Sequence, residues 1–212
     1  MARRTKKEAL ATRENIMNAA EYCFSTYGVS GTDMASVAFH ANCSRGAIYW
    51  HFIDREDLFC AILDRAQPFL SPRLCELLSV SKEHVLDSLW ACLDQYLRDI
   101  ETDEHLRCAL SIVIYRCDYS DELATHLPCW LNEQQLLLAL ICKIFERAHL
   151  HGELSEGVCV KQSSALLCFT LMGAIDFFIL RQKGRLQMEG SAVLRSFFES
   201  LRSVKNKYMI DV

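Results

Sequence analysis

The stretch Thr32–Phe52, TDMASVAFHANCSRGAIYWHF, constrains the fold more than any other part of the chain. Thr32 can cap a helix whose apolar positions follow a period of about 3.6 residues: Met34, Val37, Ala38 and Ala41. Asn42 tolerates the left-handed backbone that a tight turn needs. Ser44 can then cap a second helix, with Ala47, Ile48 and Phe52 facing inward. Two short helices joined by a tight turn form the layout of a helix-turn-helix DNA reader.

The outward face of the second helix has an unusual composition for a solvated surface. It carries Ser44, Arg45, Gly46, Tyr49, Trp50 and His51. An arginine, two aromatic residues and a histidine suit a helix pressed against phosphates and base edges. Gly46 costs roughly 1 kcal/mol inside a helix relative to alanine, and a close approach of the backbone to DNA would explain it. Thr32 and Ser44 can also hold a phosphate with the N–H groups of their helix starts.

Three segments resemble a known family. The run T-x-x-x-V-A-x-x-A-x-x-S-x-G-x-I-Y-x-H-F, ending at Phe52, resembles the DNA-binding signature of the TetR family of bacterial transcriptional regulators. The segment 54–59, DREDLF, resembles the start of that family's fourth helix. The segment 115–122, YRCDYSDE, is similar to part of the AcrR/TtgR branch, whose members repress multidrug efflux pumps. The chain departs from the usual Ala-Gly-Val at the turn, where Asn42 is the best replacement for glycine.

Charge is distributed unevenly along the chain. The net charge of −4 would by itself argue against nucleic acid, but residues 1–52 hold six Lys and Arg against four Asp and Glu, and the remainder holds 17 against 23. A basic end on an acidic body orients the chain toward a polyanion. The predicted DNA contacts are Thr32, Ser44, Arg45, Gly46, Tyr49, Trp50, His51, Arg55, Arg4 and Lys6.

Hydrophobic periodicity predicts an all-α fold of about nine helices, a small N-terminal head on a larger body. We expect a DNA-binding domain at 1–54 and an effector-binding and dimerisation domain at 55–212. A charged arm, 1–9, precedes a first helix that runs from Leu10 to the C-cap at Gly28.

Helix four opens with Asp54 as its N-cap and with Ile53 and Leu58 as a hydrophobic staple, and it runs to about Phe69. Pro68 and Pro72 bound a connection after it. Further helices are expected at 82–100, 104–117, 121–151, 161–183 and 189–207.

The eleven cysteines are scattered, and no pair has the C-x-x-C spacing of a zinc or redox motif. Small, buried, reduced side chains are the simplest interpretation, and a thiol-based sensor is the alternative. His149 and His151 are two apart, so on a helix they point away from each other and do not predict a metal site. No catalytic motif is present either, so we expect neither an enzyme nor a cofactor.

The longest apolar stretch, 165–180, is interrupted by Thr170, Gly173 and Asp176. It is shorter than the ~20 residues that a membrane span requires. We therefore expect a cytoplasmic protein with no membrane contact.

The body could hold an apolar ligand. The candidate lining residues are Trp90, Tyr96, Leu110, Ile114, Trp130, Phe169, Met172 and Asp176. Sequence alone favours a filled core, whereas the resemblance implies a cavity, since bodies of the TetR family bind small effectors. Asp176 is expensive to bury unless it is paired, so it could face a cationic ligand, a partner subunit or solvent.

The segment 161–183 is apolar nearly all round and predicts a contact with a second copy, shared with the last helix. The expected interface residues are Phe177, Phe178, Leu194, Phe197, Phe198 and Leu201.

Together these features predict a homodimeric repressor that binds a palindromic double-stranded DNA operator and is released by a small lipophilic effector. The resemblance implies that it controls a multidrug efflux operon. A thiol- or metal-responsive regulator and, from another class, a helical enzyme stay open as alternatives.

Overall fold

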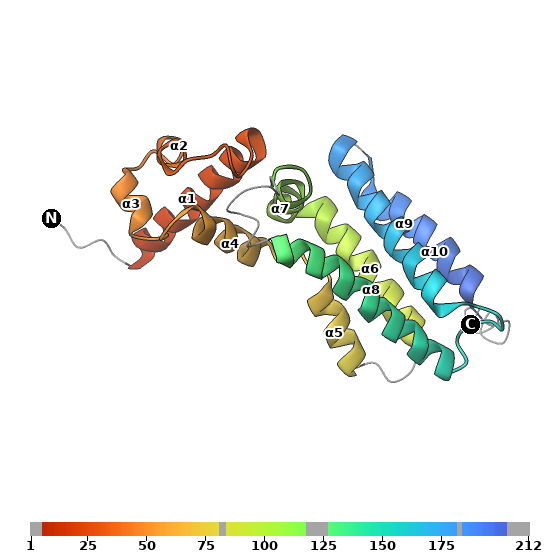
Figure 1. Cartoon of the computed structure of the whole chain (residues 1–212). Coiled ribbons are helices and arrows are strands. Elements are labelled where there is room, and N and C mark those ends of the chain that lie inside the picture. The colour runs from red at the N-terminus through yellow and green to blue at the C-terminus, as the bar shows by residue number, and fades with distance from the viewer. Residues whose placement is uncertain (1–5, 81–83, 118–126, 182–183, 203–212) are drawn as a thin grey trace. The chain divides into compact units, whose positions relative to one another are not determined.

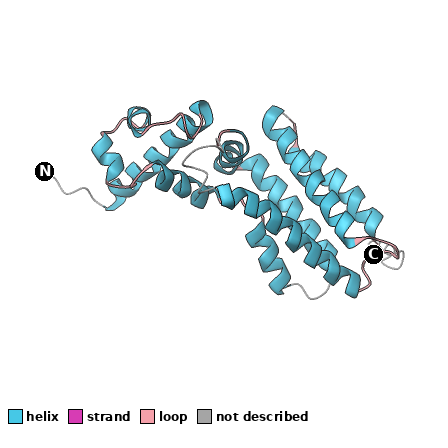
Figure 2. Ribbon diagram, viewed as in Figure 1, coloured by secondary structure: helices cyan, strands magenta, loops and turns pink. Residues whose placement is uncertain are grey.

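A computed structural model describes residues 6–80, 84–117, 127–181 and 184–202. Those residues form ten α-helices and no strand (Figures 1 and 2). Leu154 and Arg202 form an isolated antiparallel bridge. The all-α prediction is therefore confirmed.

The chain divides into two compact units. The first comprises residues 1–68 and 104–130. Its helices are α1 (Lys6–Tyr27), α2 (Met34–His40), α3 (Arg45–Tyr49), α4 (Arg55–Ala66) and α7 (Glu104–Tyr115). The second comprises residues 69–103 and 131–212. It holds α5 (Ser71–Val80), α6 (Val85–Thr102), most of α8 (Leu127–Leu150), α9 (Val160–Arg181) and α10 (Leu186–Leu201).

The core of the first unit is shared between the head and the helices that follow it. Phe24, Ile48 and Phe52 of the head are at most 2% exposed. The same cluster includes Ile62 of α4 and Ile112 of α7, both fully buried. Contacts between helices thus group α4 and α7 with the head. The predicted boundary after residue 54 separates a DNA-binding domain from an effector-binding domain, and it stays a prediction.

In the second unit, distant carboxylates satisfy the free N–H groups at two helix starts. Glu133 of α8 accepts from the Ser71 backbone N at 2.9 Å and from its Oγ at 2.5 Å, at the start of α5. Glu153, which follows α8, accepts from the backbone N atoms of Val85 and Leu86 at 2.8 and 2.9 Å, at the start of α6. Both carboxylates are buried, so these bonds hold the helix starts in place where water cannot.

The helices α1, α5 and α4 differ from the prediction. The first helix already begins at Lys6, so part of the expected arm is helical. Helix α5 is absent from the prediction, which places a connection between Pro68 and Pro72. Proline is tolerated in the first turn of a helix, which is where Pro72 lies. Helix α4 ends at Ala66, where Gln67 adopts a left-handed backbone with φ of 45°.

The predicted staple at the start of α4 is wrong, since Ile53 is 80% exposed while Leu58 is fully buried. Two carboxylates organise this helix start instead. Asp54, confirmed as the N-cap, accepts from the Asp57 backbone N at 2.8 Å, and Asp57 Oδ2 accepts from the Ile53 backbone N at 2.8 Å. This reciprocal pair resembles a capping box.

Candidate nucleic-acid interface

The first reader helix, α2, is capped by Asp33 rather than by Thr32, so the predicted cap is wrong by one residue. Asp33 Oδ1 accepts from the backbone N of Ser36 at 2.7 Å. Hydrogen bonding from that backbone N–H is the main cause that lowers the pKa of Asp33. Thr32 is 1% exposed and its hydroxyl donates to the Gly28 carbonyl oxygen at 2.7 Å. Its side chain therefore fixes the loop before α2, and its hydroxyl is not available to a phosphate.

The turn between α2 and α3 has the predicted backbone. Asn42 adopts the left-handed conformation with φ of 50°. The Cys43 backbone N donates to the Ala38 carbonyl oxygen at 3.0 Å and closes the turn. Helix α1 supports it from behind, because Asn15 Nδ2 donates to the Ala41 carbonyl oxygen at 2.6 Å.

The second reader helix, α3, is capped by Ser44 as predicted. Ser44 Oγ accepts from the Ala47 backbone N at 3.2 Å. Ile48 and Phe52 are buried, which confirms them as the inward face, and Ala47 is half-buried. This inward anchoring leaves the opposite face of α3 free.

Five of the six predicted outward residues are exposed: Ser44, Arg45, Gly46, Tyr49 and Trp50. Trp50 is 73% exposed and Tyr49 is 49% exposed. His51 is half-buried, and its ring lies edge-on to that of Trp50 with 4.6 Å between centroids. A guanidinium, a phenol and an indole thus share one surface that no other described part of the unit covers.

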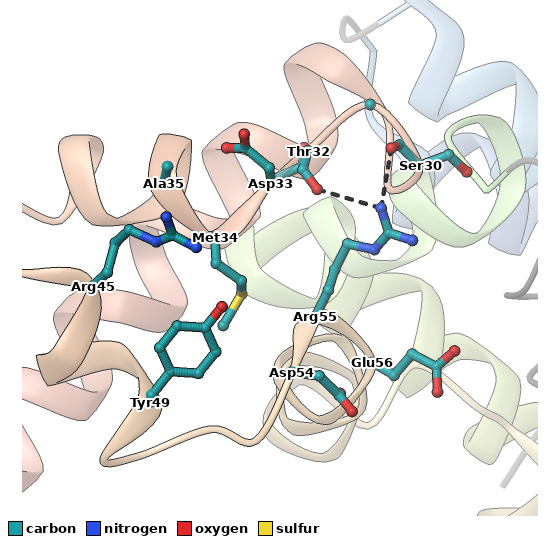
Figure 3. A pocket seen from close by; sticks show the side chains of 11 residues that line it. Ser30, Thr32, Asp33, Met34, Ala35, Arg45, Tyr49, Asp54, Arg55 and Glu56 are labelled. Carbon is teal, nitrogen blue, oxygen red and sulfur yellow. Dashed lines mark hydrogen bonds between the residues drawn. The ribbon is translucent and has the colours of Figure 1, made fainter.

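A hollow of about 610 Å³ opens beside this surface. It is lined from the α1–α2 loop, the start of α2, α3 and the start of α4 (Figure 3). Arg45 and Tyr49 lie on its α3 side, and Asp33 lies on its α2 side. The hollow therefore offers a guanidinium and a phenol hydroxyl next to the reader helix, and both can donate to phosphate oxygens, whereas the carboxylates of its lining cannot.

Arg55 has a role that sequence reasoning missed. Its Nη1 donates to the carbonyl oxygen of Ser30 at 3.0 Å and lies 3.4 Å from that of Thr32 (Figure 3). The side chain thus ties the start of α4 to the α1–α2 loop. Arg55 also lines the hollow, so its predicted contact with DNA stays a prediction.

Gly31 was missed as well. A Cβ atom on this residue would lie 2.4 Å from the Tyr27 carbonyl oxygen, so the loop closes onto α1 at a distance that only glycine allows. Of the two predicted contacts in the arm, Lys6 is exposed at the start of α1, and Arg4 lies outside the described residues.

Comparison with known proteins decides the family. Residues 16–62 match the model of bacterial regulatory proteins of the tetR family. The HTH-type transcriptional repressor BepR of Brucella suis biovar 1 is 31% identical over 209 residues, which cover 96% of this chain and 98% of that protein. The chain belongs to the TetR family.

Similar solved structures agree with this assignment. NalD, the secondary repressor of the MexAB-OprM multidrug efflux pump of Pseudomonas aeruginosa, superposes with a TM-score of 0.77 at 26% identity, covering 94% of this chain and all of NalD. The SmeT–triclosan complex gives 0.76 at 26% identity, with 92% and 93% covered. AcrR and TtgR proteins are also among the relatives, which confirms the predicted branch. The relatives are regulators, so the alternative of a helical enzyme is not favoured.

The residues predicted to line an effector cavity are distributed over both units of the TetR-family chain. Tyr96 and Leu110 are buried, and burial raises the pKa of Tyr96. Four are half-buried: Trp90, Ile114, Met172 and Asp176. Phe169 is 72% exposed, so its side chain lies at the surface of the body. The side chain of Trp130 is not among those that the structure describes.

The predicted dimer residues fall into two groups. Phe178, Leu194, Phe198 and Leu201 are buried within their own unit, where their side chains pack in the core. Phe197 is half-buried, with its ring 6.4 Å from that of Phe145. Phe177 is 52% exposed, and its place in an interface stays a prediction. Helical periodicity alone did not resolve which side of each helix faces its own core.

The exposed side of α9 carries Leu166, Phe169, Phe177 and Leu180, each more than half exposed. These positions share one helix face because they are separated by three, eight and three residues. Gly173 lies among them, and a Cβ added there would meet nothing within 4 Å. We call these five residues the α9 stripe.

By length and composition α9 could cross a membrane, and 39% of its apolar window is buried. The helix runs from Val160 to Arg181, close to the predicted 161–183. The core helix of a soluble protein meets the same criterion.

The cysteines are less buried than predicted. Cys23 and Cys168 are buried, Cys75 and Cys159 are exposed, and the other six described cysteines are half-buried. Burial is the main cause that raises the pKa of Cys108 to about 11 and of Cys168 to about 11. Raised thiol pKa values oppose the thiolate form that a sensor needs. Across the described part of the chain, no group of three His, Cys, Asp or Glu residues could hold a metal ion.

Proposed function

We propose that the protein is a ligand-responsive repressor of a multidrug efflux operon. It binds a palindromic DNA operator as a homodimer and acts in the cytoplasm. The exposed face of α3 carries this proposal, because Arg45, Tyr49 and Trp50 lie together on the outside of a helix whose other side is anchored in the core.

Two copies are expected to meet through the α9 stripe and exposed apolar residues of the neighbouring α10, where Met188 and Val193 are each 55% exposed. Large apolar surfaces of this kind mark interfaces. Two-fold symmetry would set the two α3 helices about one DNA turn apart, ~34 Å, or a small multiple of it, so the operator should be a palindrome.

The effector is expected to be small and lipophilic. This part of the proposal is supported by the half-buried aromatic and apolar residues of the body and by the triclosan that the SmeT structure contains. The efflux operon is supported by NalD, whose target is a multidrug efflux pump.

The test begins with selection of binding duplexes from random DNA by the wild-type protein. Recovery of a palindrome whose affinity, followed by fluorescence anisotropy, falls steeply with salt supports the proposal, because salt dependence reports contacts with phosphates. Triclosan then serves as the effector probe. If no duplex is enriched over the starting pool, the DNA-binding function is wrong.

A further inference from the structure

A buried carboxylate joins three helices of the first unit. Glu21 of α1 is 6% exposed. Its Oε1 lies 2.5 Å from Nη2 of Arg65 on α4, and its Oε2 lies 2.8 Å from Nδ1 of His105 on α7. Around the cluster of Glu21, Arg65 and His105, the three helices share an apolar core. The two contacts of Glu21 are therefore a polar connection inside an otherwise apolar junction.

Arg65 reinforces the connection to α1. Its Nη1 lies 3.0 Å from Oε2 of Glu14 and 2.8 Å from Oδ1 of Asn18, one turn apart on α1. The Arg65 side chain is 16% exposed. Removing one partner of a buried ion pair is strongly destabilising, because it leaves the other charge uncompensated. The position of α1 relative to α4 thus depends on this set of charges.

Helix α1 also contacts the helix-turn-helix directly. Asn15 holds the Ala41 carbonyl oxygen in the turn, and the Arg13 guanidinium lies 4.9 Å from the centroid of the Phe52 ring, just after α3. Both residues lie on the same helix as Glu21. A shift of α1 would therefore move the turn and the end of α3 together.

We propose that Glu21, Arg65 and His105 form an ionic lock that fixes α1 against α4 and α7 and thereby sets the affinity of the reader for DNA. The inference rests on the proposed function and concerns its regulation. The three residues act through α1, so they are positioning residues. A rigid, correctly placed reader binds more tightly than a loose one, because less freedom is lost on binding.

The two arms of the lock differ in how they respond to pH. A guanidinium is charged at every physiological pH, whereas an imidazole changes its charge near neutrality. The charged groups near the lock include the carboxylates of Glu14 and Glu21 and the guanidinium of Arg65, and Glu104 and Arg107 act with Glu21 and Arg65 on the neighbouring Cys108 thiol.

Three carboxylates against two guanidiniums leave the cluster with an excess negative charge. A protonated imidazole at position 105 adds a positive charge beside Glu21, whereas a neutral one can offer Glu21 only a hydrogen bond from Nδ1–H. The lock is therefore tighter at lower pH, and affinity for DNA decreases as pH rises through the range in which histidines titrate.

The test uses the full-length protein and a duplex selected from random DNA with the wild type. Anisotropy titrations from about pH 5.5 to about pH 8, the range of histidine titration, are made at constant ionic strength. We expect wild-type affinity to decrease by about tenfold, within the usual range of coupling between sites, and His105→Gln to lose most of that dependence. His149→Gln, which alters an exposed histidine at the end of α8, is the matched control and should keep the wild-type profile. An unchanged profile in His105→Gln would overturn the lock.

A second variant separates the lock from simple loss of folding. Replacing both charges in Glu21→Leu/Arg65→Leu exchanges an ion pair for apolar contact, which proteins often tolerate. We expect cooperative thermal unfolding to persist and the pH dependence of binding to disappear. If this folded variant keeps the full dependence, the inference is wrong while the proposed function stands. If the wild type selects no duplex at all, both are wrong.

Discussion

Arg45 and Tyr49 face the hollow beside α3 and are exposed, so removing either side chain should leave the fold intact. Arg45→Ala and Tyr49→Ala should each weaken DNA binding by ~1–3 kcal/mol per contact, and a dimer loses each contact twice. Anisotropy and thermal unfolding measure the two effects separately. Lys143→Ala, at an exposed position on α8, is the control. Wild-type affinity in both variants would place the DNA surface elsewhere.

Gly31 is where we expect a single methyl group to have a large effect. Gly31→Ala brings a Cβ to 2.4 Å from the Tyr27 carbonyl oxygen, and backbone rather than a flexible side chain would have to move. The unfolding free energy should fall by roughly 1–3 kcal/mol, as for other strained backbone sites. Gly46→Ala is the comparison, since its new Cβ meets only Ser44 Oγ at 3.8 Å. Equal melting temperatures for the two variants would contradict the close approach at Gly31.

The thiols should react at very different rates. Thiolates are the reactive form, so Cys108 and Cys168, whose pKa values burial raises to about 11, should label slowly with a maleimide at neutral pH. Cys75 and Cys159 are exposed and should label first. Mass spectrometry of peptides at successive times gives the order. Rapid labelling of Cys108 in the folded protein would revive the thiol-sensor interpretation.

For single residues, helix caps and turns were predictable from the sequence where one side chain determines them. Ser44 and Asp54 cap their helices, and Asn42 takes the left-handed turn, as their side chains favour. Thr32 and Asp33 are adjacent and can both cap, so sequence could not rank them. The bond from Arg55 to Ser30 spans 25 residues, and no local pattern contains it.

Among the elements, α9 supports the sharpest test of assembly. Phe169→Glu/Phe177→Glu places two charges on the α9 stripe without touching the core, so folded monomers with weakened DNA binding are expected. Sedimentation velocity measures the association state, and Val80→Glu, at an apolar position on α5 that is 71% exposed, is the matched control. A dimeric double variant would place the interface on another surface. Changing Phe178 and Phe198 would test folding instead, because both are buried.

Long helices were predictable from their apolar periodicity, and short or proline-bounded ones were not. Helix α6 was expected at 82–100 and runs from Val85 to Thr102. Helix α5 carries Pro72 at its second position, and its start depends on Glu133, more than 60 residues away. Propensity and period describe a helix by itself, whereas its ends depend on partners that only the folded chain brings near.

For the whole molecule, effector and operator must influence each other equally. If triclosan weakens operator binding by some factor, the selected duplex must weaken triclosan binding by the same factor. Calorimetry with and without the duplex measures both sides of this cycle. An effect in only one direction would mean that triclosan acts by some route other than binding the native repressor.

The architecture as a whole was predictable, because the helix-turn-helix motif is local and specific. The effector site was not predictable from the sequence. Tyr96 and Leu110 lie in different units and carry no shared sequence pattern. Burial separated Phe177 from Phe178, adjacent residues that periodicity had placed in one interface.

The shared core of the first unit limits how this repressor can be re-engineered. A chimaera that joins residues 1–54 to a foreign body would leave Phe24 without Phe59, whose ring lies 6.0 Å away on α4, and would remove the cover that Ile112 supplies from α7. Specificity could be transplanted only with α4 and α7, or with a recipient whose own helices reproduce their shape. The portable module is thus a set of five helices gathered from two separate stretches of chain.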